Sequence, residues 1–96
     1  MDLSVILPTY NEKNNIVNLV NQILEVIKNI ENKEIIIVDD NSSDGTYLTC
    51  KTAFEKNSGI KIILRENNRG LANSIIEGIK ASNGKKIIVM DTDFAH

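Results

Sequence analysis

Four short apolar runs, rich in isoleucine and valine, are spaced along the chain. They cover residues 4–7, 35–38, 60–64 and 87–90, and none of them alternates regularly with polar residues. Strands that are buried on both faces, as in a parallel sheet, have this pattern. We therefore predict four buried strands at these positions.

The segments between these runs carry apolar residues at three- and four-residue steps, which is typical of helices with one buried face. For the first helix we predict Asn11 as the N-cap. Its apolar stripe consists of Ile16, Leu19, Val20, Ile23, Leu24, Ile27 and Ile30. The second helix is expected to begin near Ser43 or Asp44 and to end at residues 57–59. The third is expected to end at residues 83–84, and its stripe consists of Leu71, Ile75, Ile76 and Ile79.

Strands and helices alternate along the whole chain, without a repeat, linker or low-complexity segment. This alternation predicts one α/β domain over residues 1–96, a Rossmann-like parallel sheet with helices on both faces. Because crossovers between parallel strands are right-handed, we expect the strand order 3-2-1-4. In such a sheet, ligands bind at the carboxyl ends of strands 1 and 4, where the two following loops diverge.

Composition and charge narrow the choice of partners and compartment. The net charge of -2 gives no overall attraction to nucleic acid, and we expect no nucleic-acid partner. A single cysteine, Cys50, excludes an internal disulfide and fits a reducing compartment. No histidine is near it in its predicted helix to lower the thiol pKa, so we expect no catalytic role for it. We expect a cytoplasmic protein, because the N-terminus lacks the pattern of a signal peptide and no apolar run is long enough to span a membrane.

Acidic residues gather where three of the predicted strands end, and six carboxylates lie in these loops: Glu12, Asp39, Asp40, Asp44, Asp91 and Asp93. Clustered carboxylates repel one another unless a positive charge neutralises them. A divalent cation, Mg²⁺ or Mn²⁺, is the simplest such charge. The D-x-D of Asp91 and Asp93 follows a strand, so both carboxylates can reach one ion. We predict these two residues as metal ligands that take part in catalysis.

Other roles for these residues stay open at this point. Aspartate and asparagine are common after strands because they form turns and cap helices, and for Asp44 this is the favoured interpretation. The loop after the first strand has no glycine, so it is neither a dinucleotide-binding turn nor a P-loop. Tyr10 can stack on a nucleobase or fill space at the surface. Asp40 can accept hydrogen bonds from a base or cap a helix.

Together, four segments resemble the family 2 glycosyltransferases, and within them the dolichol-phosphate mannosyltransferase group. The segments are residues 5–12 (VILPTYNE), residues 37–46 (IVDDNSSDGT), residues 69–72 (RGLA) with Gly78, and residues 89–96 (VMDTDFAH). They span the whole chain in the order and with the spacing of that family. The resemblance implies a GT-A fold that binds a nucleoside diphosphate sugar.

The resemblance also implies roles for individual residues. Those that match nucleotide-sugar-binding positions are Pro8, Tyr10, Glu12, Val38, Asp40, Asp91 and Thr92. Asp91 and Asp93 match the metal ligands. Thr92 stands where the family often has alanine, and Ala95 stands where some members have a glutamine that ligates the metal. Arg69 matches a segment near the nucleotide-sugar, where it can pair with phosphate or remain a surface charge.

The reaction implied is sugar transfer, of mannose from GDP-mannose, to a polyprenyl or dolichyl phosphate. A metal would bridge the two phosphates and neutralise charge on the leaving group. The lipid acceptor implies that the complete enzyme works at the periphery of a membrane. UDP-sugars stay open as alternative donors.

The chain ends directly after the D-x-D motif, so we expect a truncated GT-A domain that binds nucleotide weakly and is inactive alone. Its fourth strand would then be an open edge, through which we expect homo-oligomers to form. An inactive half-domain that self-associates is therefore one alternative. A haloacid-dehalogenase-like phosphatase is another, but that family has Thr or Val where this chain has Ala95.

Overall fold

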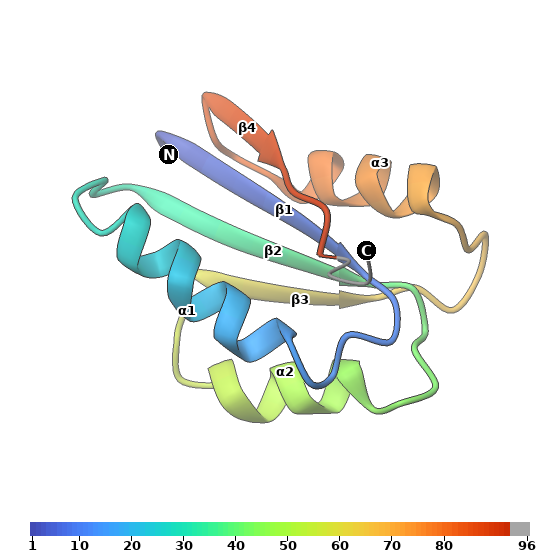
Figure 1. Ribbon diagram of the computed structural model, residues 1–96. Coiled ribbons are helices and arrows are strands. Elements are labelled where there is room, and N and C mark those ends of the chain that lie inside the picture. Colours follow the sequence, from blue (N-terminus) through green and yellow to red (C-terminus); the bar gives the residue numbers. More distant parts are fainter. Residues whose placement is uncertain (93–96) are drawn as a thin grey trace.

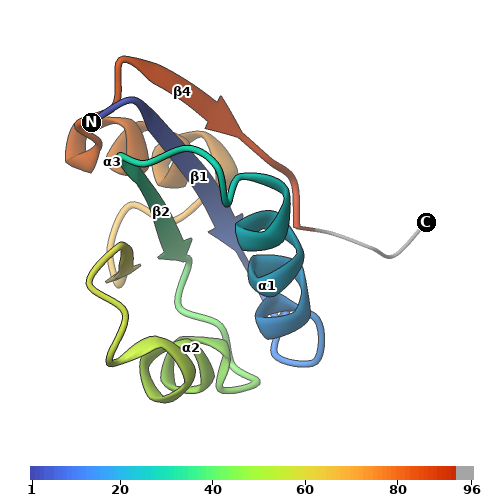
Figure 2. The same ribbon diagram turned by 90° about the vertical axis from the view of Figure 1, so that its left-hand side faces the viewer.

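A four-stranded parallel sheet lies between two layers of helices (Figure 1). The computed structural model describes residues 1–92. The strands are β1 (Leu3–Thr9), β2 (Lys33–Asp39), β3 (Ile60–Leu64) and β4 (Lys86–Val89). The helices are α1 (Ile16–Val26), α2 (Thr46–Phe54) and α3 (Leu71–Ala81). Figure 2 shows α1 and α3 on opposite sides of β1.

The strand order is β3-β2-β1-β4, which confirms the predicted order 3-2-1-4. All three pairs of neighbouring strands are parallel, with Val5 of β1 opposite Ile35 of β2 and Ile88 of β4. Every residue of β1 is buried. The carboxyl ends of β1 and β4 therefore lie next to each other, at the edge where the topology predicts a ligand.

The hydrophobic core has two parts because side chains of the central strands alternate between the faces. One part joins Val5, Leu7, Ile35 and Ile37 to α1 and α2. The smaller part, on the face that α3 covers, is formed by Ile6, Ile36 and Val38. In α3, Gly78 allows a close approach, since a Cβ atom there would lie 2.5 Å from Ile6 Cγ2.

The start of the first helix differs from the prediction. Asn11 is not its N-cap, because α1 begins at Ile16 and Asn15 is the residue before it. Asn11 has a positive φ of 53°. Its side-chain carbonyl accepts a hydrogen bond from the Ser43 backbone N–H at 3.0 Å, a contact between two loops. The helix also ends at Val26, so Ile30 packs against the core from a loop.

The second helix begins at Thr46, two residues after Asp44. Asp44 Oδ1 accepts a hydrogen bond from the Thr46 backbone N–H at 2.9 Å, which supports its interpretation as a turn and capping residue. The fourth strand also differs from the prediction of a strand buried on both faces, because all four residues of β4 are exposed. Within residues 1–92, β4 is an edge strand that pairs with β1 alone. Over the same range, no helix has the length and apolar character needed to cross a bilayer.

Candidate functional site

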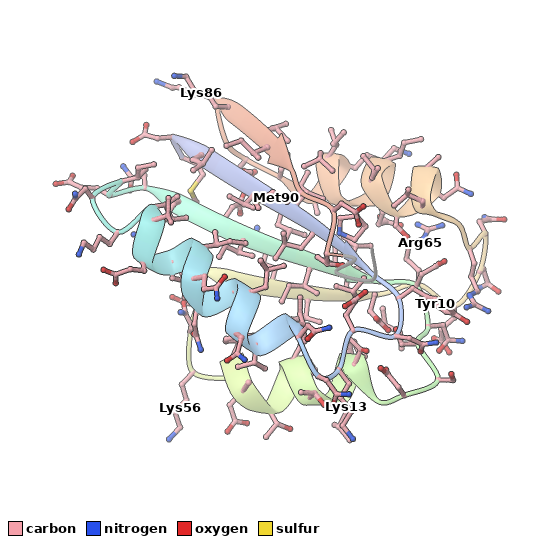
Figure 3. All side chains as sticks on the ribbon, in the orientation of Figure 1. Tyr10, Lys13, Lys56, Arg65, Lys86 and Met90 are labelled. Atoms are coloured by element: carbon pink, nitrogen blue, oxygen red, sulfur yellow. The ribbon has the colours of Figure 1, made fainter. Side chains whose placement is uncertain are left out.

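A cavity of about 660 Å³ lies at the carboxyl ends of β1, β2 and β4. It is lined by Pro8 and Thr9 at the end of β1, by residues 10–12 and Asn15 after β1, by Asp40 after β2, by Leu71 and Ser74 at the start of α3, and by Asp91 and Thr92 after β4. Figure 3 shows that Tyr10, at this end of the sheet, lies far from Lys86 at the amino end of β4. The cavity therefore occupies the switch point that the topology predicts.

Hydrogen bonds between the loops after β1 and β2 fix the side of the cavity that carries Tyr10. The Asn11 backbone N–H donates to Ser42 Oγ at 2.8 Å, and the Glu12 N–H donates to Thr46 Oγ1 at 3.0 Å. The Lys13 N–H donates to Asp44 Oδ2 at 3.1 Å. Burial alone would raise the pKa of Asp44, but hydrogen bonds from Thr46 and Lys13 outweigh it and hold the pKa below its ordinary value.

Asp39, at the end of β2, stabilises the loop that follows this strand, and it is not among the residues that line the cavity. Its carboxylate accepts hydrogen bonds from Thr9 Oγ1 at 2.8 Å, from the Ser42 N–H at 2.9 Å and from Ser42 Oγ at 2.6 Å. The residue is fully buried. The carboxylate of Asp39 is thus hydrogen-bonded by the protein itself. Fewer acidic side chains share the cavity than the sequence predicted. Among the described acids of that group, Glu12, Asp40 and Asp91 line the cavity.

Asp40 joins the loop after β2 to the start of α3. Its Oδ2 accepts a hydrogen bond from the Gly70 N–H at 2.9 Å, and its backbone carbonyl accepts one from Arg69 Nε at 2.9 Å. The Arg69 guanidinium lies 5.4 Å from the centre of the Tyr10 ring, within the range of a cation–π contact. Tyr10 remains 53% exposed, so its ring is accessible to a ligand.

Thr92 ties the segment after β4 to the end of β1. Its Oγ1 donates a hydrogen bond to the Pro8 carbonyl at 2.8 Å, and the side chain is buried. The N–H of Met90, two residues earlier, donates to the Ile6 carbonyl at 3.0 Å. The structure therefore explains a threonine at this position, because an alanine has no hydroxyl to donate to the Pro8 carbonyl. The neighbouring Asp91 is exposed and lines the cavity.

One predicted site residue is placed away from the cavity, and another lies outside the described residues. Val38 is fully buried, packs with Ile6 and Ile36 beneath α3, and its side chain is not part of the cavity lining. Asp93, the second predicted metal ligand, lies outside the described residues, as does Ala95. Within the described range, no three His, Cys, Asp or Glu side chains are grouped so that they could hold a metal ion.

Comparison with known proteins agrees with this geometry. The family model described as "Glycosyl transferase family 2" matches residues 4–96. The chain belongs to glycosyl transferase family 2.

Among the curated members of this family, the dolichol-phosphate mannosyltransferase of Pyrococcus furiosus is 38% identical over 96 residues, which is all of this chain and 27% of that protein. The enzyme of the same name from Saccharomyces cerevisiae is 33% identical over 98 residues, covering all of this chain and 37% of the yeast protein. The chain thus spans between about a quarter and two fifths of the length of these relatives.

Solved structures confirm the GT-A type of fold. The mannosyltransferase PcManGT from Pyrobaculum calidifontis, in complex with GDP-Man and Mn²⁺, matches with a TM-score of 0.80 at 24% identity, over 95% of this chain and 27% of that one. TarS 1-349 from S. aureus matches with a TM-score of 0.78 at 29% identity, over 97% of this chain and 28% of that one. The fold predicted from the four sequence segments is therefore correct.

Two further residues differ in their relation to the cavity, since Ser74 lines it and Cys50 does not. Ser74 lines the cavity and was missed by sequence reasoning; the one signal for it is its place one helical turn after Gly70. Cys50 is fully buried, and burial together with the nearby charge of Asp39 raises its pKa to about 12. A buried thiol with this pKa is protonated at neutral pH, which argues against a nucleophilic role for Cys50.

Proposed function

We propose that this chain is the nucleotide-sugar-binding part of a metal-dependent glycosyltransferase, one that transfers mannose from GDP-mannose to a polyprenyl or dolichyl phosphate. The observation that carries this proposal is the single cavity shared by Tyr10, Asp40 and Asp91, which come from three separate loops. The names of the curated relatives support the reaction and the lipid-phosphate acceptor. The neighbour in complex with GDP-Man and Mn²⁺ supports the donor.

The nucleoside would bind between the loops after β1 and β2. Tyr10 offers an exposed ring on which a base can stack, and the Arg69 guanidinium lies 5.4 Å from the centre of that ring. Asp40 Oδ1 is buried and has no hydrogen-bond partner among the described residues, so it is available to an N–H group of a base. Guanine and uracil both present such an N–H, which makes UDP-sugars the alternative donors. TarS, in complex with UDP and with UDP-GlcNAc, supports this alternative.

The diphosphate and a metal ion would lie near the end of β4. Mg²⁺ and Mn²⁺ prefer oxygen ligands and commonly take one or two carboxylates together with substrate phosphates. The exposed carboxylate of Asp91 fits this chemistry, and Asp93 is the second ligand that the sequence offers. When bound, the ion neutralises negative charge on the departing diphosphate. Thr92 and Pro8 hold Asp91 in position through their hydrogen bond.

Calorimetric titration of the chain with GDP and with UDP, each with and without Mn²⁺, tests the proposal. We expect binding that requires Mn²⁺ and that falls at least tenfold in Asp91→Ala, because an interaction with a charged group of this kind contributes about 1.5–3 kcal/mol. Glu25→Gln is the matched control, since Glu25 is exposed on α1 and pairs with Lys28 alone among the described residues. Equal binding by Asp91→Ala and the parent chain would contradict the metal role, and no binding of either nucleotide would contradict the function.

A second candidate property is self-association through the edge of the sheet. Ile87, Ile88 and Val89 of β4 are 42%, 47% and 41% exposed, an unusual degree for three consecutive large apolar residues. Unpaired strand edges tend to pair with another chain, and a symmetric dimer would cover two such edges at once. Sedimentation analysis should therefore detect dimers that the charged edge variant Ile88→Lys cannot form. A parent chain that stays monomeric at high concentration would contradict this candidate.

A further inference from the structure

Ser74 is a buried polar residue whose hydroxyl has no hydrogen-bond partner within residues 1–92. It lies on the inner side of the first turn of α3, is 2% exposed, and lines the cavity. Burying a hydroxyl without a partner costs free energy, so such groups are rare unless a ligand or a water completes them. Because Ser74 lines the cavity, a ligand bound there can supply such a partner.

The helix itself does not supply the missing partner. Serine in a helix often donates to the carbonyl three or four residues earlier, as Ser82 does at the end of α3, where its Oγ donates to the Ile79 carbonyl at 2.7 Å. The corresponding carbonyl for Ser74 is that of Gly70, which accepts the Ser74 backbone N–H at 3.0 Å. The Ser74 hydroxyl forms no such bond, which leaves it available to a group in the cavity.

A second unpartnered polar atom belongs to Asp40, which lines the same cavity as Ser74. Asp40 Oδ1 is buried without a hydrogen bond within the described range, and Arg69 Nε lies 3.9 Å from it. The other oxygen of Asp40 accepts a hydrogen bond from the backbone N–H of Gly70, the residue before α3 and four residues before Ser74, which corresponds to about 6 Å of rise along a helix axis. The lining of the cavity thus combines a carboxylate acceptor with a hydroxyl that can donate.

We propose that Ser74 donates a hydrogen bond to a carbonyl of the nucleobase while Asp40 accepts from the adjacent ring N–H. Guanine and uracil both place a carbonyl directly beside a ring N–H, whereas adenine and cytosine in their ordinary forms do not. Ser74 is thereby a specificity-determining residue for a keto base. This inference rests on the proposed nucleotide-binding function and adds to it the residue that completes recognition of the base.

The first test compares Ser74→Ala with the parent chain, by calorimetric titration with whichever of GDP and UDP the parent binds more tightly in the presence of Mn²⁺. We expect the affinity of Ser74→Ala to fall about three- to tenfold, the effect of one lost neutral hydrogen bond. Ser82→Ala is the control, because Ser82 is on the same helix and outside the cavity lining. An unchanged affinity in Ser74→Ala would overturn the proposal. A parent chain that binds neither nucleotide would instead overturn the proposed function.

Two further readouts separate base recognition from a structural role. Without nucleotide, Ser74→Ala should melt at the same temperature as the parent chain or above it, because the variant no longer buries an unpaired hydroxyl; a clearly lower melting temperature would indicate a structural role instead. The second readout uses 6-thio-GDP, or 2-thio- and 4-thio-UDP, whose thiocarbonyl sulfur is a weak acceptor. The penalty of Ser74→Ala should shrink with the analogue that replaces the contacted carbonyl. If Ser74→Ala lowers the affinity equally for the natural nucleotide and for every thio analogue, the hydroxyl does not contact a carbonyl of the base, and the proposal is overturned.

Discussion

The backbone N–H of Gly70 donates a hydrogen bond to the carboxylate of Asp40 at 2.9 Å, and this contact fixes the start of α3 against the loop after β2. The preceding Arg69 donates to the Asp40 carbonyl and faces the Tyr10 ring. Asp40 therefore orients both the helix and the cation on one side of the cavity.

Gly70→Ala should destabilise the fold and weaken nucleotide binding together. Gly70 has φ 130° and ψ 153°, a region that residues other than glycine rarely adopt, so we expect a loss of about 1–3 kcal/mol. A Cβ atom at this position would meet nothing within 4 Å, so the loss comes from the backbone alone. Chemical denaturation measures the first effect and nucleotide titration the second. Ala72→Gly, in the exposed part of α3, is the control: a loss of about 1 kcal/mol with unchanged affinity. A Gly70→Ala variant as stable as the parent chain would contradict the assigned backbone.

Arg69→Ala should lower nucleotide affinity several-fold without a large change in stability, because the Arg69 side chain is 44% exposed and the ring of Tyr10 would lose its neighbour. Titration calorimetry measures the affinity. The chain offers a matched control in Lys51, whose ammonium lies 5.9 Å from the Tyr47 ring, away from the cavity lining. If Lys51→Ala and Arg69→Ala reduce affinity equally, the Arg69–Tyr10 contact has no specific part in binding.

Gly78→Ala should destabilise the protein because α3 lies too close to the sheet for a side chain there. The added Cβ would lie 2.5 Å from Ile6 Cγ2 and 3.2 Å from Val38 Cγ2, both of which are fully buried. Overpacking of this kind costs about 1–3 kcal/mol. The free energy of unfolding in urea measures it, with Asn73→Ala on the exposed side of α3 as the variant expected to cost little. Equal stability of the two variants would show that the helix can move away from the sheet at no cost.

Glu34 should make the stability of the chain depend on pH in the acid range. Burial raises the pKa of Glu34, but hydrogen bonds from Ser4 and Asn83 and the charge of Lys61 outweigh it, so the pKa lies below its ordinary value of 4.5. A carboxylate with a lowered pKa stabilises the folded state above the unfolded pKa, and this contribution is lost as the pH falls through the folded pKa. Stability should therefore fall as the pH is lowered below 4.5.

The matched pair Glu34→Gln and Glu31→Gln tests this dependence, since Glu31 is exposed. At pH 7 we expect Glu34→Gln to lose about 1–3 kcal/mol, because Glu34 accepts from Ser4 Oγ at 2.6 Å and from the Asn83 N–H at 2.7 Å. The difference from the parent chain should shrink as the pH approaches 3. A difference that is constant over the whole range would contradict the role of the ionised form.

The sequence was sufficient to predict the strand order, because four buried apolar runs alternate with helical stripes and crossovers are right-handed. It was not sufficient where a role depends on distant partners. Asn11 resembles a helix cap locally, but its contacts are with Ser42 and Ser43, 31 and 32 residues away. Val38 and Asp39 are neighbours in β2 whose side chains point to opposite faces, and the pattern alone does not say which face lies under α3.

The site could be predicted as far as its acidic and aromatic residues, because Tyr10, Glu12, Asp40 and Asp91 follow strands directly. Ser74 could not be found in the same way. Ser74 stands out because its buried hydroxyl has no hydrogen-bond partner within the described range, and the hydroxyl becomes buried only when α3 packs against the sheet. Likewise, Thr92 gains its role from the Pro8 carbonyl, 84 residues earlier in the chain.

Paramagnetic broadening of the amide NMR signals tests the central claim most directly, namely that the loops after β1 and β4 share one nucleotide-and-cation site. The ¹⁵N-labelled chain would be saturated with GDP and Mg²⁺, and Mn²⁺ would then be added in small amounts. We predict selective loss of the signals of Tyr10, Asn11 and Thr92, while Gly59 and Lys86, at the amino ends of β3 and β4, keep theirs. Broadening centred on the amino ends of the strands, or of the Thr92 signal without those of Tyr10 and Asn11, would contradict the account.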